Sequence, residues 1–356
     1  MEDNNKLIQK VSPLKCAGRI TLKFFSVLFS ILLVVVIAIL ALIWVLAKGP
    51  SPTAQRLFVM SVRETSAVGW LANIYLTDSE IEGILRFPEQ DNEAYETDTS
   101  LIAIPAARPS RPKSHSSEVL LEETEEEADD DDGIELFDVS RNGYRGYMLV
   151  VSDPFRVFVG TPDKLGNYGM SLMDMVEKTG AVAGINAGGF YDPNGVSTGG
   201  IPKGIVICDG ELIWGAGSGY GNVIGFDADG ILHTGTMTPA AAMNLGLRWA
   251  VSFGPTLISN GVASDKGLLR SGINPRTAIG QRADGAVLLL VIDGRQIGSL
   301  GATYEDLVET FLDFEAVNAA NLDGGASTLM IIGGEFINNC AAVSGPRLLP
   351  TAFLVR

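Results

Sequence analysis

The sequence is poor in the residues that build metal sites and nucleophilic triads. Its 356 residues include two histidines, His115 and His233, and three cysteines. No Cys-x-x-Cys pair occurs, so the usual zinc patterns are excluded. His233 is the only histidine after residue 134, which disfavours a Ser-His-Asp hydrolase. We therefore expect no metal and no cofactor, and a disulfide between Cys208 and Cys340 stays open because no spacing implies one.

Basic residues are also scarce, and the acidic excess is unevenly spread. The formal net charge is −16. Residues 89–133 hold 15 acidic and 3 basic residues, whereas residues 134–356 hold 21 and 14. Without a basic face to neutralise phosphates, a nucleic-acid partner is excluded.

One long apolar run stands near the N-terminus. Residues 24–47 contain no charge and are long enough to cross a hydrocarbon core of roughly 30 Å as a helix. Five basic residues precede the run, which predicts a cytosolic segment 1–23 and an extracellular remainder. A cleaved signal peptide is the alternative, but its apolar region is usually only about 7–15 residues long. We expect a retained single-pass anchor in the cell membrane.

Two segments separate this anchor from the rest of the chain. Residues 48–87 show partial helical periodicity, with Thr77 or Asp78 able to cap a second short helix, and predict a helical stalk. The stalk is either a partner-binding element or a spacer over the end of the membrane helix, and we favour the spacer. Residues 88–133 combine Pro, Ser and a dense acidic run, which is typical of a disordered linker.

The composition changes at residue 134. Short apolar runs alternate with Asp-Gly turns at 208–211, 227–230 and 283–286, and each turn predicts a β-hairpin. Helix signals are few: Ser171 can cap 172–179, Thr303 and Asp306 resemble a capping box, and Pro239 can open a short helix. Residues 134–356 are therefore predicted to form an α+β domain, a mostly antiparallel or mixed β-sheet with a few packed helices.

Polar side chains stand at the ends of three apolar runs in this domain, each next to glycine. Asp323 precedes Gly324 and Gly325, and Asn186 precedes Gly188 and Gly189. Glycine lets the backbone bend sharply and lets a ligand approach it closely.

The third run, Val287–Ile292, is followed directly by Asp293, and Arg295 stands two residues later. A hairpin turn with a surface ion pair is the alternative interpretation of that pair. We expect the three strand ends to build one site.

Taken in order, these pieces resemble the phosphodiester glycosidase family over roughly residues 144–356. The matching segments are Gly184–Phe190, Gly200–Gly204, Ser252–Pro255, Asn274–Gly280, Val291–Arg295 and Asn321–Gly325. Ala326 stands where the family often has a third glycine after the Asp. The resemblance implies a hydrolase that cleaves the bond between a sugar and a phosphodiester.

Such a reaction needs a carboxylate near the sugar C1 and cations on the leaving phosphate. Asp323 is our first candidate for the carboxylate, as nucleophile or as base for water, and Asp293 is the second. Arg276 and Arg295 are the predicted phosphate contacts, with Lys203 or Arg347 as alternatives.

The remaining candidates contact the substrate. Asn186 can hydrogen-bond to sugar hydroxyls, or can satisfy backbone groups at a bend. Asp192 is either a turn residue or a ligand contact. Gly188, Gly189, Gly324 and Gly325 complete the predicted substrate-binding set.

We therefore predict a membrane-anchored extracellular glycosidase acting on a sugar-1-phosphodiester in an envelope or exported glycan. A non-catalytic anchored module that binds anionic polysaccharide is the alternative. Asp293 and Asp323 favour the enzyme, because carboxylates oppose the binding of an anion.

Overall fold

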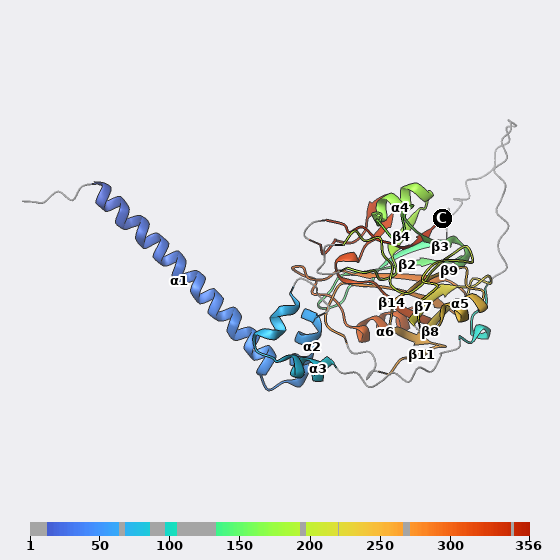
Figure 1. The fold of residues 1–356 in the computed structure, drawn as a ribbon, viewed down its shortest axis with the longest axis horizontal. Helices are drawn as coiled ribbons and strands as arrows, with labels where there is room; N and C mark the ends of the chain where they lie inside the picture. Colours follow the sequence, from blue (N-terminus) through green and yellow to red (C-terminus); the bar gives the residue numbers. More distant parts are fainter. Residues whose placement is uncertain are drawn as a thin grey trace, which may run out of the picture.

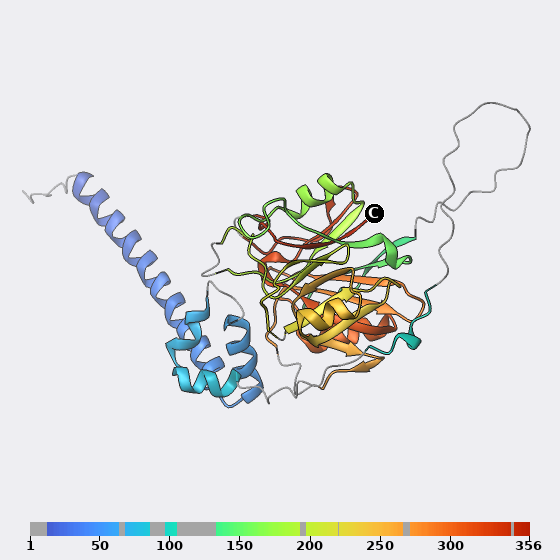
Figure 2. The same cartoon turned by 45° about the vertical axis from the view of Figure 1, so that its right-hand side comes forward.

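A computed structural model describes residues 13–63, 68–85, 97–104, 133–192, 197–219, 221–265, 271–342 and 345–356. The apolar run lies in one helix, α1 (Pro13–Lys48), which extends away from the rest of the molecule (Figures 1 and 2). Its segment Lys23–Lys48 is long and apolar enough to cross a membrane, and few of its side chains are buried. The helix is therefore a candidate membrane span.

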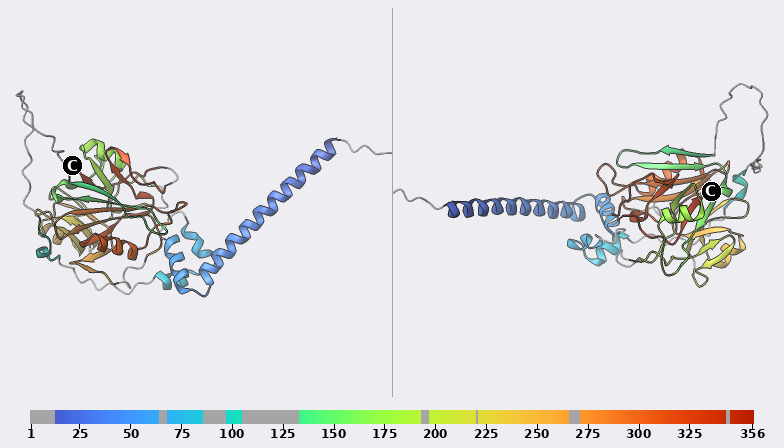
Figure 3. Two further views of the ribbon diagram at one scale, coloured as in Figure 1. Left: turned by 180° about the vertical axis from the view of Figure 1, so that it is seen from behind. Right: turned by 90° about the horizontal axis from the view of Figure 1, so that it is seen from above.

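A small helical unit follows α1 with a hydrophobic core of its own. It consists of α2 (Pro52–Arg63), the 3-10 helix η1 (Gly69–Ile74) and α3 (Asp78–Leu85). Ala47, Val59 and Ile81 are among its buried residues. The unit lies between the end of α1 and the large domain (Figure 3), and the Ile273 amide donates to Ser61 Oγ at 2.9 Å between the two parts.

The large domain is built from three sheets whose named strand pairs are all antiparallel, which confirms the predicted fold class. The seven-stranded sheet runs β1 (Ile134–Asp138), β2 (Gly146–Val151), β13 (Val287–Ile292), β12 (Arg276–Arg282), β14 (Ala316–Leu322), β10 (Thr256–Ser259) and β11 (Val262–Ala263). A five-stranded sheet runs β16 (Glu335–Phe336), β15 (Met330–Ile332), β4 (Ala183–Asn186), β17 (Ala352–Val355) and β3 (Val157–Gly160). A second one runs β6 (Glu211–Trp214), β5 (Val206–Cys208), β9 (Trp249–Ser252), β7 (Gly221–Phe226) and β8 (Leu232–Met237).

The inner faces of the three sheets share one hydrophobic core, and a helix packs on the outer face of each sheet. Leu289, Ile185 and Val251 represent the three sheets in that common core. The covering helices are α4 (Leu172–Thr179), α5 (Pro239–Asn244) and α6 (Tyr304–Asp313) (Figure 1).

The predicted helix signals act as expected. Ser171 caps α4 and the left-handed Gly180 ends it, Pro239 opens α5, and Thr303 and Asp306 form both halves of a capping box on α6.

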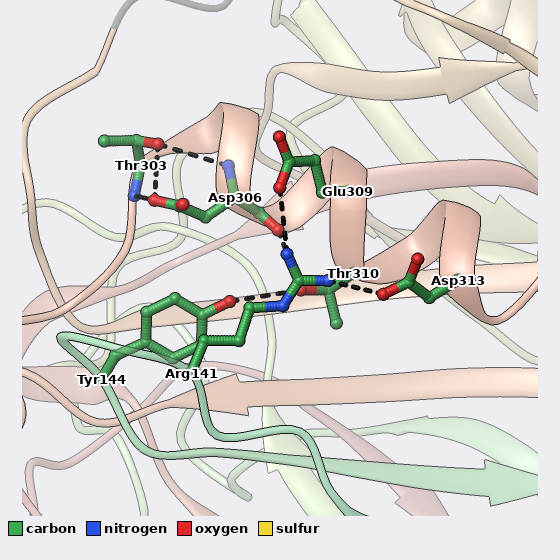
Figure 4. Close-up of polar contacts among 7 residues, drawn as sticks. All are labelled: Arg141, Tyr144, Thr303, Asp306, Glu309, Thr310 and Asp313. Atoms are coloured by element: carbon green, nitrogen blue, oxygen red, sulfur yellow. Dashed lines mark hydrogen bonds and ion pairs between the residues drawn. The ribbon is translucent and has the colours of Figure 1, made fainter.

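The outer end of α6 is fixed by the turn between β1 and β2 (Figure 4). Arg141 on that turn pairs with Glu309 at 2.9 Å and with Asp313 at 2.5 Å. The hydroxyls of Tyr144 and Thr310 lie 3.4 Å apart in the buried space beneath the pair. These exposed ion pairs contribute little individually, so the buried apolar face of α6 supplies most of its attachment.

The Asp-Gly turns join β5 to β6, β7 to β8 and β12 to β13 as predicted. The linker differs from its prediction in one part, because residues 97–104 pack on the domain. Ile102 is buried there, and the Ala103 amide donates to Ala283 O at 2.7 Å. Residues 88–96 and 105–132 of the predicted disordered linker lie outside the described residues. Cys208 and Cys340 are free thiols.

Candidate active site

Strand ends from all three sheets meet around Asp323. This residue follows β14, Asn186 ends β4, and Ser252 ends β9. The Asp323 amide donates to Ala187 O at 2.9 Å, and Asn186 Nδ2 donates to Asp323 O at 2.5 Å. The backbone of Asp323 is thus hydrogen-bonded to a second sheet, which fixes the position of its Cα and so of its side chain.

The structure gives Asn186 a supporting role. Its side chain is fully buried, and its Oδ1 accepts from Thr277 Oγ1 at 2.8 Å and from the Leu329 amide at 3.1 Å. Because both ends of the amide are bonded within the protein, Asn186 positions Asp323. The bend-satisfying interpretation therefore fits this geometry better than a contact with sugar hydroxyls.

At two of the predicted glycines, neighbouring atoms leave no room for a side chain. A Cβ on Gly189 would stand 2.6 Å from Phe253, and one on Gly324 would stand 2.7 Å from Pro275 O. Gly325 has a left-handed φ of +64° and opens the 3-10 turn η5 (Gly325–Ser327). Ala326 lies inside that turn with an ordinary φ, so the missing third glycine does not disturb it.

The carboxyl group of Asp323 has an unusual pKa. Burial raises it from 3.8 to about 6, opposed by a hydrogen bond with Ser327 and by the charges of Arg347 and Lys203. The neighbouring charge of Asp192 raises it further. A carboxyl that titrates near neutral pH is suited to accept or deliver a proton.

Arg347 and Asp192 form an ion pair beside Asp323, with 2.7 Å between Arg347 Nη1 and Asp192 Oδ2. The guanidinium of Arg347 lies 4.9 Å from the centre of the Phe190 ring, and the Ser197 amide donates to Asp192 at 3.0 Å. Burial opposes ionisation of Asp192, but these partners outweigh it and lower its pKa. The pair holds an arginine fork at the site in a fixed position.

Asp293 and Arg295 lie on the other side of the Asp323 turn. The exposed Arg295 has a left-handed φ of 58°, and a Cβ on Gly325 would stand 3.4 Å from its guanidinium. Asp293 is 1% exposed, and Asn338 Nδ2 and the Asn339 amide each donate to its Oδ1 at 3.0 Å. Burial raises the pKa of Asp293. Its two hydrogen bonds connect the 338–339 segment to the end of β13 inside the domain.

The side chain of Arg276, a predicted phosphate contact, lies against the start of α6 and away from Asp323. Its guanidinium is 4% exposed, donates to Ala302 O at 3.0 Å and to Gly272 O at 2.6 Å, and lies 4.4 Å from the Tyr304 ring centre. These contacts are at the start of α6. Its neighbour Thr277 points to Asn186, and side chains alternate along a strand. The geometry gives Arg276 a structural role at the α6 end.

The cations that influence Asp323 are Arg347 and Lys203, which the sequence suggests only as alternative phosphate contacts. Ser327 is not among the residues predicted from the sequence. The signal for Ser327 was its hydroxyl four residues beyond Asp323, within the same glycine-rich turn. For Arg347 no local signal exists, because it is brought to Asp323 by the loop before β17.

Comparison with known proteins decides the family. Residues 179–356, half of the chain, match the family model described as phosphodiester glycosidase. The chain belongs to the phosphodiester glycosidase family.

Similar proteins include N-acetylglucosamine-1-phosphodiester alpha-N-acetylglucosaminidase of Mus musculus, 28% identical over 211 residues, covering 53% of this chain and 40% of that protein. The SPbeta prophage-derived protein YomE of Bacillus subtilis (strain 168) is 28% identical over 199 residues, covering 52% and 29%. The chain thus spans less than half the length of these relatives.

Among solved structures, the zebrafish catalytic domain of the same N-acetylglucosaminidase, auto-inhibited by its pro-peptide, superposes with a TM-score of 0.54 at 20% identity. The match covers 63% of this chain and 82% of that one. It shows that the fold is shared.

Segments shared with the phosphodiester glycosidase family converge on Asp323 in this fold. The Lys203 amide donates to Gly189 O at 2.8 Å, and Ser252 Oγ accepts from the Ile205 amide at 2.9 Å. The Gly325 amide donates to Pro275 O at 2.9 Å. The ordered sequence pieces are therefore parts of one three-dimensional site.

Proposed function

We propose that this protein hydrolyses the bond between C1 of a sugar and a phosphodiester. The observation that carries the proposal is the position of the Asp323 carboxyl where strand ends of the three sheets meet, near the charges of Arg347 and Lys203. Burial raises its pKa to about 6 against the effect of these two cations. One group can react at C1 while the two cations receive the phosphate. Family membership supports the reaction class.

Asp323 acts in this proposal as the nucleophile or as the base for water. The leaving group is a phosphate monoester, a stable anion that needs charge stabilisation more than it needs a proton. Arg347 supplies a planar fork, already oriented by Asp192 and Phe190, and Lys203 supplies a second charge. Arg295 lies beside Gly325, at the edge of the Asp323 turn, and we propose that it contacts the substrate there. We propose no phosphate contact for the Arg276 side chain, because it bonds to Ala302 and Gly272.

We further propose that the enzyme is anchored by α1 and faces outward, toward a phosphodiester-containing glycan of the envelope or an exported polymer. The uncharged stretch of α1 and the basic residues before it support this orientation. Residues 1–23 would then be cytosolic, with the helical unit and the domain outside.

The test is incubation of the full chain in detergent with a panel of sugar-1-phosphodiesters, with detection of released free sugar. Asp323→Asn is the inactive variant, and Asp229→Asn, an exposed aspartate in a hairpin turn, is the matched control. Turnover by wild type and by Asp229→Asn, but not by Asp323→Asn, supports the proposal. Binding of anionic glycan without turnover on any member of the panel would favour a non-catalytic module.

A further inference from the structure

An exposed loop with two large aliphatic side chains lies beside the Asp323 turn. In residues 295–300, the apolar loop, Ile297 is 103% exposed and Leu300 is 63% exposed. Arg295 opens this loop and lies against Gly325 of the Asp323 turn. Two large aliphatic side chains therefore face solvent next to a polar site, where folding gains nothing from them.

The same loop is connected to the helical unit by a short series of contacts. Arg295 Nη2 donates to Asn274 Oδ1 at 2.8 Å, and the Ile273 amide next to Asn274 donates to Ser61 Oγ on α2. A Cβ on Gly272 would stand 2.3 Å from the Ser61 amide, so α2 and this segment are in direct contact.

The helical unit in turn is attached to the end of the candidate membrane span. Gln55 Nε2 on α2 donates to Ala47 O of α1 at 2.6 Å. Ser61 is nine residues beyond Pro52, so it lies about 14 Å along the α2 axis from the residue at which α2 begins. Trp44 on α1 and Trp70 on η1 are both more than half exposed, and tryptophan is enriched at membrane interfaces.

We propose that the apolar loop contacts the surface of the bilayer that α1 spans, and that the substrate is a sugar-1-phosphodiester linked to a membrane lipid. This inference rests on the proposed hydrolase activity and on the proposed anchoring by α1. Water adds its oxygen to C1 while the bond from C1 to the phosphate oxygen breaks. The sugar leaves as a free hemiacetal, and the lipid keeps a phosphate monoester.

The bilayer is the occupant that the connections favour, because Asn274 and Ser61 connect Arg295 to α2, and α2 is hydrogen-bonded to the end of α1. A lipid-linked sugar phosphate would present its phosphate at the headgroup level, within reach of Arg347, while Ile297 and Leu300 enter the acyl boundary. A soluble substrate has no use for these two side chains.

The first arm of the test measures lipid contact without any enzyme activity. The full chain, with its three cysteines changed to alanine, carries Ile297→Cys labelled with an environment-sensitive dye and is reconstituted in vesicles. The matched control is Val262→Cys on β11, 69% exposed and on the side of the domain away from the direction in which α1 extends (Figure 1). We expect quenching by shallow spin-labelled lipid at position 297 and none at 262. Equal signals at the two positions would overturn the bilayer contact.

The second arm compares two substrates that share a sugar, one with a long-chain lipid aglycone in the vesicle and one with a methyl aglycone in solution. In the full chain with native cysteines, Ile297→Ser with Leu300→Ser should lower kcat/KM at least tenfold for the lipid-linked substrate and less than twofold for the methyl one. Val262→Ser should change neither value. A double variant with equal losses on both substrates, or with none, contradicts the lipid-linked substrate. No turnover of either substrate by wild type contradicts the hydrolase activity and with it this substrate assignment, while the quenching result decides the bilayer contact separately.

Discussion

Asp227 and Asp323 each follow the last residue of a strand and begin a turn that contains glycine, yet their surroundings differ. Asp227 Oδ1 accepts from the amides of Asp229 and Ile231 at 2.9 and 3.0 Å, and its Oδ2 lies 2.7 Å from His233 Nε2. Despite burial, these partners lower the pKa of Asp227. Asp323 has instead a pKa raised to about 6. Asp227 is satisfied by two amides of its own turn and by His233, and is structural. Asp323 has a hydrogen bond with Ser327 of its own turn but also faces cations from distant segments, which leaves it available for chemistry.

A cavity in this domain lies beside the structural turn at Asp227 and not beside Asp323. Its volume is about 390 Å³, and it is lined also by Arg248 and Trp249. The cavity and Asp323 lie at opposite ends of β4. Asn186, which bonds to Asp323, pairs with Ala352 at one end, and Ala183 pairs with Val355 at the other end, next to Arg356 of the cavity. The cavity and the Asp323 turn are therefore separate places in the domain.

The largest expected effect separates the two aspartates by activity. Asp323→Asn should lower kcat on a sugar-1-phosphodiester by about 1,000-fold or more, roughly 4 kcal/mol, because a reacting carboxylate is lost. Asp227→Asn should leave kcat within about threefold while lowering the free energy of unfolding by about 1–3 kcal/mol. Steady-state kinetics and urea unfolding of both variants check this. Activity of Asp323→Asn within about tenfold of wild type would remove it from the mechanism.

The next effect separates two arginines. Arg347→Ala should lower kcat/KM on a phosphodiester by about 100-fold or more, since a well-placed donor to an oxyanion stabilises the transition state by roughly 2.7–4 kcal/mol. Its effect on a neutral activated glycoside of the same sugar should be smaller. Arg276→Ala should affect both substrates equally and reduce stability, because its contacts are with Ala302 and Gly272. A substrate-dependent loss in Arg276→Ala would return that residue to the phosphate site.

A third experiment perturbs only the Asp227 end. Ile104 packs against Gly230 of that turn, 3.3 Å from where its Cβ would be, and Ile102 is 6% exposed nearby in sequence. Ile102→Ala should cost about 2 kcal/mol or more in urea unfolding and leave kcat unchanged. Leu101→Ala, at a position 41% exposed, is the control and should cost less than about 0.5 kcal/mol. Equal costs for the two changes would mean that residues 97–104 do not pack on the domain in solution.

The smallest effect is in the pH dependence of stability, where the two aspartates have opposite signs. Asp227 has a lowered folded pKa, so its contribution is present above its ordinary value of 3.8 and is lost as the pH falls through the folded pKa. Asp323 has a raised folded pKa, so its contribution is present below 3.8 and is lost as the pH rises through about 6. Between pH 4 and 7 Asp323→Asn should therefore gain stability relative to wild type. Asp227→Asn should be less stable at pH 7 by a margin that narrows in acid. Parallel curves for both variants would refute the contrast.

Local features of the fold could be predicted from the sequence because neighbouring residues determine them. The Thr303–Asp306 capping box, the Gly180 helix stop and the Asp-Gly hairpins all depend on contacts within a few residues. Strand ends and adjacent glycines also predict the proximity of Asp323 and Asn186, whereas the sequence indicates Asp192 only as a turn residue or a ligand contact.

The direction of a side chain and the packing of distant loops could not be predicted in this way. Arg276 is held by Tyr304 and Ala302, which its own strand does not reveal. Arg347 comes to Asp323 from a segment more than twenty residues later in the chain. Residues 97–104 end in an apolar run of only four residues, Leu101–Ile104, which is too short to stand out within the acidic linker, although Ile102 is buried.

The pH dependence of kcat/KM on a sugar-1-phosphodiester tests the central claim most directly, because it reports the ionisation of the reacting group in the free enzyme. With Asp323 as nucleophile or base, the rate should rise with pH and level off above an apparent pKa of about 6. A rate that is already at its maximum at pH 4, or that shows no acid limb between pH 4 and 7, would contradict the assignment of Asp323 as the reacting carboxylate.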